Sequence, residues 1–154
     1  MNLNHTHLFT LSLDVAPLDS YQIGAMSTGR RVIVPINGGS FKGDRLQGMV
    51  EPGGYDWAFF RKDGVMEIDV RLVLKTYSDE LIYLSYRGRL LASVDVHKRM
   101  AKGEEISDDD YSLTTTVAFE TSAEGLEWLN NVVAVGVGRQ EGYQPTYEVF
   151  QVGR

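Results

Sequence analysis

The clearest pattern of hydrophobic and polar positions lies in residues 65–76. Hydrophobic side chains occupy positions 66, 68, 70, 72 and 74, and charged ones occupy positions 67, 69, 71 and 75. Successive side chains of a strand point to opposite faces, so this alternation is typical of β-structure. The pattern predicts a long strand with one apolar face and one polar face.

Shorter β-branched and aromatic runs predict eight more strands. They cover residues 7–15, 31–36, 43–50, 55–61, 81–87, 112–121, 132–138 and 146–152. The polar segments 16–29 and 104–110 are expected to be loops. Residues 94–102 predict a short helix that Gly103 ends, and residues 124–130 predict a brief helical or turn segment.

Glycines mark where these strands bend. Seven fall within residues 29–54, four of them in two Gly-Gly pairs. Such density among β-branched runs predicts strands that bulge and turn tightly. Asn37-Gly38-Gly39 predicts a turn that ends the strand at residues 31–36, and Asp63-Gly64 predicts a hairpin.

Many strands at short spacing with little helix predict an all-β fold, either a barrel or a sandwich. We expect one domain over residues 1–154. Its architecture is predicted to be an antiparallel β-barrel of about 8–10 strands with one or two short helices.

The composition of the chain argues against nucleic-acid and membrane partners. The chain has 154 residues, 43% of them hydrophobic and 23% charged, with a net charge of −6. A negative field repels phosphate backbones, so no nucleic-acid partner is expected. No apolar run approaches the roughly 20 residues of a membrane helix, and the N-terminus resembles no signal peptide. We therefore expect a cytoplasmic protein with no membrane partner.

The absence of several residue types and motifs argues against thiol, metal-dependent and nucleotide-dependent chemistry. The chain has no cysteine, which excludes disulfides, zinc–thiolate sites and a thiol nucleophile. Its three histidines show no metal-binding spacing, and no phosphate loop, nucleophile elbow or complete dinucleotide motif occurs. We expect no metal site and no cofactor.

Asp56 and Trp57 are the first candidate pair. A carboxylate beside a large ring suits a pocket where stacking holds a substrate and burial raises the pKa of the carboxyl toward acid–base use. The alternative is that Trp57 belongs to the core and Asp56 caps a turn after Gly53-Gly54.

Asp69 and Arg71 are the second candidate pair. They lie two apart on one predicted strand, so both project from the same face of the sheet. If the apolar face lines the barrel, they form a solvated outer ion pair worth ~0–1 kcal/mol. If the polar face points inward, they are a catalytic pair in a cavity. Periodicity alone leaves both orientations open.

Further candidates would hold a substrate rather than react with it. Arg31 could clamp an oxyanion, although its neighbour Arg30 points to the other face and at most one of the two can do so. Tyr83, Tyr86, Tyr111 and Tyr147 offer phenols that donate hydrogen bonds, and Glu120 is a third carboxylate. For each of these residues the alternative is an ordinary position on the surface or wall of a sheet.

A set of motifs resembles one family. The chain contains, in order, the motifs G-R-R, N-G-G-S-F-x-G, L-x-G, P-G-G-x-D-W, D-G and D-x-R, and later Phe119-Glu120-Thr121 and Trp128-Leu129-Asn130. This set of motifs is similar to that of the domain of unknown function 3237 family. The resemblance covers roughly residues 7–152. It implies a β-barrel with a ligand-sized interior, and it implies no particular reaction.

Two positions depart from that pattern. Ser78-Asp79-Glu80 stands where the family usually has Asp-Gly, and Thr114 stands where an arginine is common. If that arginine binds an anion in relatives, the ligand of this chain differs.

Carboxylates, arginines and tyrosines in a small barrel predict proton-transfer chemistry. We expect a cofactor-independent lyase, isomerase or cyclase acting on a small oxygenated organic ligand. Asp56 or Asp69 would be the base, and Arg71 and a tyrosine would stabilise the enolate. The alternatives are a carrier or sensor barrel for an apolar ligand, and a homodimeric interaction module that uses the apolar face of residues 66–74.

Overall fold

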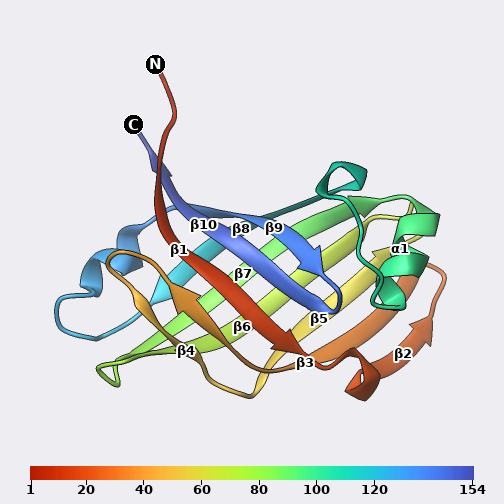
Figure 1. The fold of residues 1–154 in the computed structure, drawn as a ribbon, viewed down its shortest axis with the longest axis horizontal. Coiled ribbons are helices and arrows are strands. Elements are labelled where there is room, and N and C mark those ends of the chain that lie inside the picture. Colours follow the sequence, from red (N-terminus) through yellow and green to blue (C-terminus); the bar gives the residue numbers. More distant parts are fainter.

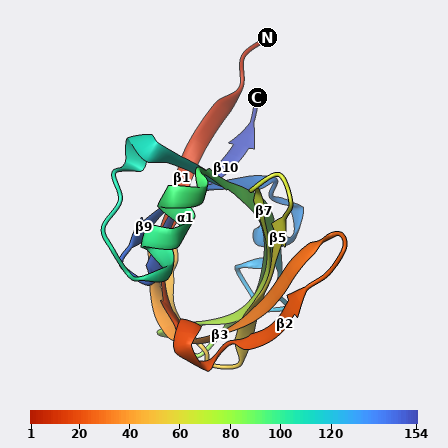
Figure 2. The same ribbon diagram turned by 90° about the vertical axis from the view of Figure 1, so that its right-hand side faces the viewer.

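Ten strands form one antiparallel sheet that closes into a barrel (Figure 1). The computed structural model describes all residues, 1–154. Figure 2 looks along the barrel and shows the strands as a ring. The strands are β1 (Asn4–Val15), β2 (Tyr21–Ala25), β3 (Gly29–Lys42), β4 (Gln47–Val50), β5 (Gly54–Arg61), β6 (Met66–Thr76), β7 (Leu81–Ala92), β8 (Tyr111–Glu120), β9 (Ala134–Glu141) and β10 (Gln144–Gly153). The predicted all-β antiparallel barrel is confirmed.

Short helices lie at the two ends of the barrel. The only α-helix, α1 (Val94–Ala101), lies at one end, and the 3₁₀ helix η3 (Glu127–Asn131) lies at the other (Figure 1). Two further 3₁₀ turns are η1 (Pro17–Asp19) and η2 (Asp108–Asp110). The Ser93 hydroxyl caps α1 by accepting a hydrogen bond of 3.1 Å from the Val96 amide. None of these helices has both the length and the apolar character that a membrane span requires.

Strand β3 closes the ring because it bonds to four other strands. Its first half, Gly29–Ile36, lies between β2 and β5, and its second half lies between β1 and β4. The pairing of β1 with β3 joins the two ends of the sheet. A closed sheet leaves few unpaired edges, which is how a barrel satisfies its backbone groups.

The turn predicted at Asn37-Gly38-Gly39 is wrong, because β3 runs through it. Gly39 instead lets two backbones approach. A Cβ on Gly39 would lie 2.1 Å from the Ser12 carbonyl oxygen of β1. The register of β1 against β3 also shifts between Asp14 and Val15. The glycine pair therefore marks the corner where the barrel closes rather than the end of a strand.

The other differences from the predicted elements are smaller. The predicted loop at residues 16–29 contains β2, an edge strand that pairs only with β3. Strand β4 begins at Gln47 rather than at residue 43. The long strand at residues 65–76 and the helix at residues 94–102 are confirmed within one residue at each end.

The apolar face of β6 points into the barrel. Ile68, Val70, Leu72 and Leu74 are at most 5% exposed and belong to the main core cluster. They pack inside a single chain, so this face is not available to a second copy. The orientation that puts Asp69 and Arg71 on the outside is therefore the one that the fold adopts.

Large side chains fill the half of the barrel near η3. Phe9 contacts Phe41 and Phe119, with ring centroids 5.6 Å and 6.0 Å apart. Leu129 of η3 is 1% exposed and belongs to the same cluster. This half is solid core, which leaves the half near α1 as the place for a ligand.

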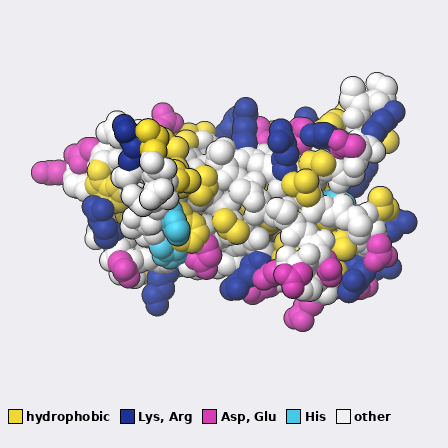
Figure 3. All heavy atoms as spheres, turned by 90° about the horizontal axis from the view of Figure 1, so that it is seen from above, with side chains coloured by type: hydrophobic (Ala, Val, Ile, Leu, Met, Phe, Trp, Pro, Cys, Tyr) yellow, Lys and Arg dark blue, Asp and Glu magenta, His cyan; other side chains and the backbone are white.

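Charges of both signs are dispersed over the face that is seen from above in Figure 3. Patches of hydrophobic side chains lie between them, and no region of that face carries one sign alone. This face offers no basic stripe of the kind that tracks a nucleic-acid backbone.

We predict that Gly39→Ala destabilises the barrel by about 2–5 kcal/mol, the sum of backbone strain and overpacking. The new methyl group would overlap the Ser12 carbonyl oxygen, and the backbone φ of Gly39 is +140°. Urea unfolding followed by circular dichroism measures the loss.

Gly53→Ala is the matched control. Gly53 also has a positive φ, +104°, but no atom lies within 4 Å of an added Cβ. Its substitution should cost only the backbone strain, about 1–2 kcal/mol. Equal losses in the two variants would show that the approach of β1 to β3 does not constrain the fold.

Candidate functional site

A cavity of about 320 Å³ opens inside the barrel at the end that carries α1. Residues of α1, η1 and the β9–β10 turn surround its mouth, and strands β3, β5 and β6 form much of its wall. Of its 22 lining residues, 14 are hydrophobic. The lining contains one carboxylate, one arginine and one histidine, which are Asp56, Arg30 and His97.

Asp56 reaches this cavity from the middle of β5. In the sheet it lies opposite Val34 of β3 and Val70 of β6. Ala58 and Phe60, two and four residues further along β5, line the same cavity, as alternation along a strand requires. Of the predicted catalytic residues, Asp56 is the one that faces the interior.

The hydrogen-bond ladder between β5 and β6 opens beside Asp56. The register sets Trp57 opposite Asp69, yet no pairing forms at Trp57 or Ala58. The Asp69 amide instead donates to Asp56 Oδ1 at 3.2 Å. The Trp57 carbonyl accepts from Arg31 Nη1 at 2.6 Å. Two side chains thus replace a backbone hydrogen bond, and the carboxyl of Asp56 is fixed at the wall.

Burial makes this carboxyl a proton exchanger near neutral pH. Desolvation raises the pKa of Asp56 to about 7. The hydrogen bond from the Asp69 amide and the charge of Arg31 lower the pKa of Asp56, while the charge of Asp69 raises it. The side chain keeps some accessible surface because it faces the cavity. At neutral pH, Asp56 can both accept and release a proton.

Two tyrosines share the interior with Asp56. Tyr147 lines the cavity, and its ring packs against that of Tyr86 with centroids 5.1 Å apart. Burial, followed by the negative charge of Asp56, raises the pKa of Tyr147, and burial raises the pKa of Tyr86 well above its usual value. Both phenols stay protonated at neutral pH, and Tyr147, which lines the cavity, can donate a hydrogen bond to an oxyanion there.

One glycine of β9 makes room for Tyr147. A Cβ on Gly138 would lie 2.7 Å from the Tyr147 ring and 2.5 Å from the Leu113 side chain. A Cβ on Gly136 would instead crowd Thr115 Oγ1, at 2.5 Å. A larger side chain at position 138 would therefore crowd the Tyr147 ring.

Arg30 and His97 flank Phe60 at the mouth of the cavity. The Arg30 guanidinium lies 4.3 Å from the centroid of the Phe60 ring, and its Nη1 donates to Gln22 Oε1 at 3.4 Å. His97 meets Phe60 edge to face at 5.9 Å. Its Nε2 lies 2.8 Å from the Gly64 carbonyl oxygen. A carbonyl can only accept, so Nε2 carries the proton.

The remaining predicted site residues lie on the outside of the barrel. Arg31, Trp57 and Asp69 line a groove on the outer face of β5–β8. Arg71 and Tyr83 line an adjacent hollow with Asp69, and Glu120 lines a third hollow with Tyr83. Alternation along β5 and β6 turns Trp57, Asp69 and Arg71 outward, which is one of the two orientations that the sequence pattern left open. Asp69 pairs there with Arg87, at 3.5 Å.

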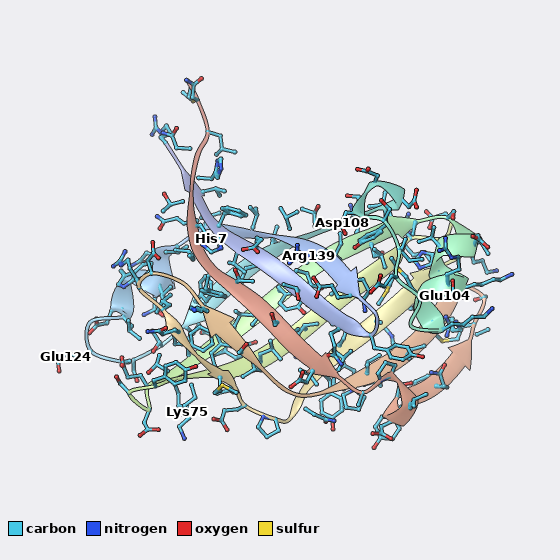
Figure 4. All side chains as sticks on the ribbon, viewed as in Figure 1. His7, Lys75, Glu104, Asp108, Glu124 and Arg139 are labelled. Atoms are coloured by element: carbon cyan, nitrogen blue, oxygen red, sulfur yellow. The ribbon has the colours of Figure 1, made fainter.

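Other charged side chains also lie outside. The labelled residues in Figure 4 project away from the barrel wall or from its end loops. Lys75 Nζ lies 3.5 Å from Asp79 Oδ1, and Arg139 Nε lies 2.9 Å from Glu141 Oε1. Such exposed pairs stabilise by ~0–1 kcal/mol each. Asp56 takes part in no ion pair.

Sequence reasoning selected neither Arg30 nor His97 for the site, and it named Tyr86 only as one of four candidate phenols. It favoured Arg31 over Arg30, although the alternation along β3 turns Arg30 toward the cavity. Tyr86 lies two strands from Asp56 in the sheet, so no local pattern connects them. His97 joins the site because α1 folds over the end of the barrel.

No group of three or more His, Cys, Asp or Glu side chains that could hold a metal ion is present.

A family model covers nearly the whole chain. The model described as "Protein of unknown function (DUF3237)" matches residues 3–152. A UPF0311 protein of Rhodopseudomonas palustris is 26% identical over 150 residues, which is 97% of each chain. A UPF0311 protein of Clostridium acetobutylicum is 29% identical over 70% of this chain and 68% of its own.

Solved structures share the fold. A conserved protein of unknown function from Rhodopseudomonas palustris superposes with a TM-score of 0.93 at 25% identity, covering 99% of each chain. A β-barrel-like protein of Acinetobacter baumannii AYE gives a TM-score of 0.85 at 33% identity, covering 99% of this chain and 98% of that one. A structure described as an enzyme from Penicillium herquei gives 0.73 at 22% identity, covering 99% and 96%, and shows likeness of fold alone.

We predict that Asp56→Asn stabilises the protein at alkaline pH. The folded state holds the Asp56 proton up to a pKa of about 7, and the unfolded state releases it near 3.8. Between these values the folded state binds more protons, so wild-type stability falls as pH rises, and above about pH 7 the full cost of the buried charge remains. The advantage of Asn should grow by about 2–3 kcal/mol from pH 5 to pH 8.5.

Parallel urea titrations of wild type and variant at the two pH values check this. Asp44→Asn, at an exposed loop position, is the control and should give the same difference at both. An Asp56→Asn advantage that does not change with pH would mean that the carboxyl is ionised in the folded protein throughout this range.

Proposed function

The chain belongs to the DUF3237 family, and we propose that it is a cofactor-independent enzyme that moves protons on a small oxygenated organic molecule. The reaction would be a lyase, isomerase or cyclase step that begins with loss of a proton beside a carbonyl or from a hydroxyl. The observation that carries this proposal is the position of Asp56, the single carboxylate that lines the interior cavity. Its surroundings raise its pKa to about 7.

Asp56 is the base in this proposal. Its ionised form would take a proton from the substrate, and its protonated form would return the proton to another atom of the same molecule. A group with a pKa near the working pH serves both steps. General acid–base catalysis of this kind contributes roughly 10²–10⁴ in rate.

Tyr147 is the oxyanion donor. Loss of a proton beside a carbonyl places negative charge on the substrate oxygen, and a protonated phenol stabilises that charge by donating a hydrogen bond. Tyr86 would hold the Tyr147 ring through their contact. Asp69 and Arg31 act from outside the cavity by setting the pKa of Asp56.

A carrier or sensor barrel is the second candidate. The largely hydrophobic lining of the cavity, 14 of 22 residues, favours it. A carrier would bind an apolar ligand and release it unchanged. The two proposals differ in whether Asp56 must ionise for the protein to act.

Solvent-deuterium exchange tests the enzyme while its natural substrate is still unidentified. Extensively dialysed, chelator-treated protein is incubated in D₂O with a panel of cyclic ketones and diketones, and exchange of the protons beside the carbonyl is followed by NMR. We expect catalysed exchange for at least one compound, and Asp56→Asn should lower it by about 10²–10⁴.

If the protein binds some of these compounds but catalyses exchange of none, the result would favour the carrier. Exchange that is lost on dialysis and restored by a metal ion would contradict the cofactor-free mechanism. Exchange that Asp56→Asn leaves unchanged would remove Asp56 from the role of base.

We also predict the direction in which the pH profile of exchange shifts in two variants. The rate should rise with pH through about 7 as Asp56 ionises. Arg31→Gln removes a charge that lowers the pKa of Asp56, so the midpoint should move up. Asp69→Asn removes a charge that raises that pKa, so the midpoint should move down. Midpoints that move in the same direction in both variants would contradict this account of the electrostatics.

A further inference from the structure

We propose that Arg30 is a specificity-determining residue that selects substrates carrying a carboxylate at the end of the molecule opposite the reacting group. This inference rests on the proposed function, because it names the substrate class of the same cavity. It is carried by the position of Arg30 along β3 and by the two contacts that hold its guanidinium.

The register fixes the separation of Arg30 from Asp56. Asp56 lies opposite Val34, and Arg30 lies opposite Phe60, four residues away along the same pair of strands. At 3.3 Å per residue, their backbones are about 13 Å apart along the strand direction. Both residues line the same cavity. A substrate that touches both is therefore elongated, with polar groups at its two ends.

The wall between the two polar ends is apolar. Val32, Ala58, Phe60 and Ile68 line the cavity there, from three neighbouring strands. A volume of about 320 Å³ is that of roughly ten water molecules in the liquid. The cavity thus suits a hydrocarbon body of one to three rings or a comparable chain.

The Arg30 guanidinium is held in place but keeps free donors. It stacks on the Phe60 ring at 4.3 Å and gives one hydrogen bond to Gln22. It forms no ion pair with a carboxylate of the protein. A guanidinium has five N–H donors, so a planar fork remains for a carboxylate. Arg30 is also the only lysine or arginine among the lining residues.

Adjacent Arg31 provides a matched control. It has the same side chain and also stacks on an aromatic ring, that of Phe59, at 4.8 Å. However, it lines the outer groove and donates to the Trp57 carbonyl. The two arginines differ in the face of β3 on which they lie: Arg30 lines the cavity and Arg31 does not.

Binding of paired probes tests the proposal. The probes are hydroxybenzoate, hydroxynaphthoate and hydroxybiphenyl carboxylate, each compared with its methyl ester, and dissociation constants are measured by calorimetry. We expect wild type to bind the longer acids about threefold to fivefold more tightly than their esters, since the acid gains an ion pair with Arg30, an exposed side chain whose charge solvent screens in part. Arg30→Gln should remove this preference, and Arg31→Gln should keep it.

Equal binding of acid and ester by wild type, or no binding of any acid at millimolar concentration, would overturn the proposal. Loss of the preference in Arg31→Gln but not in Arg30→Gln would also overturn it. The readout does not involve proton transfer, so Asp56→Asn should retain the preference. If wild type prefers acids to esters but catalyses no deuterium exchange, the protein is an anion-selective carrier. If it catalyses exchange but shows no preference for acids, it is an enzyme for neutral substrates.

Discussion

The closure of the sheet through β3 is the constraint on which the rest of the structure depends. This strand bonds to β2 and β5 along its first half and to β1 and β4 along its second half. Its backbone can approach β1 because residue 39 has no side chain. Without this corner the sheet would remain open, and the apolar faces of its strands would lack one enclosed interior.

Closure converts the alternation along each strand into an inside and an outside. On β6, alternate positions from Ile68 to Leu74 fill the core, so the charged positions between them must face solvent. On β5 the same rule turns Asp56 inward among hydrophobic neighbours. A carboxyl in that position is costly in its charged form, and this cost is the origin of its raised pKa. The chemistry that we propose therefore follows from a buried polar group that folding stability alone would not favour.

The interior is divided into a solid half and a hollow half. Phenylalanine rings and Leu129 fill the end near η3, whereas α1, η1 and the β9–β10 turn surround an opening at the other end. The polar groups of the cavity lie at different depths, with Asp56 near the middle of the barrel and Arg30 nearer the mouth. Solved structures of similar proteins share the barrel. Such a cavity, largely apolar with a few convergent polar groups, is the usual form of a small-molecule site.

The sequence by itself determined the class of fold, most strand positions, the helix at residues 94–102 and the candidacy of Asp56 and Tyr147. Alternation and turn residues act over a few positions, so they can be seen in the chain alone. Only the tertiary structure decided which face of each strand points inward, and hence that Arg30 rather than Arg31 lines the cavity. It also showed that Asn37-Gly38-Gly39 continues a strand, because the atom that requires a glycine there belongs to Ser12, far away in the sequence. Inside and outside are properties of a closed sheet, and no single strand carries that information.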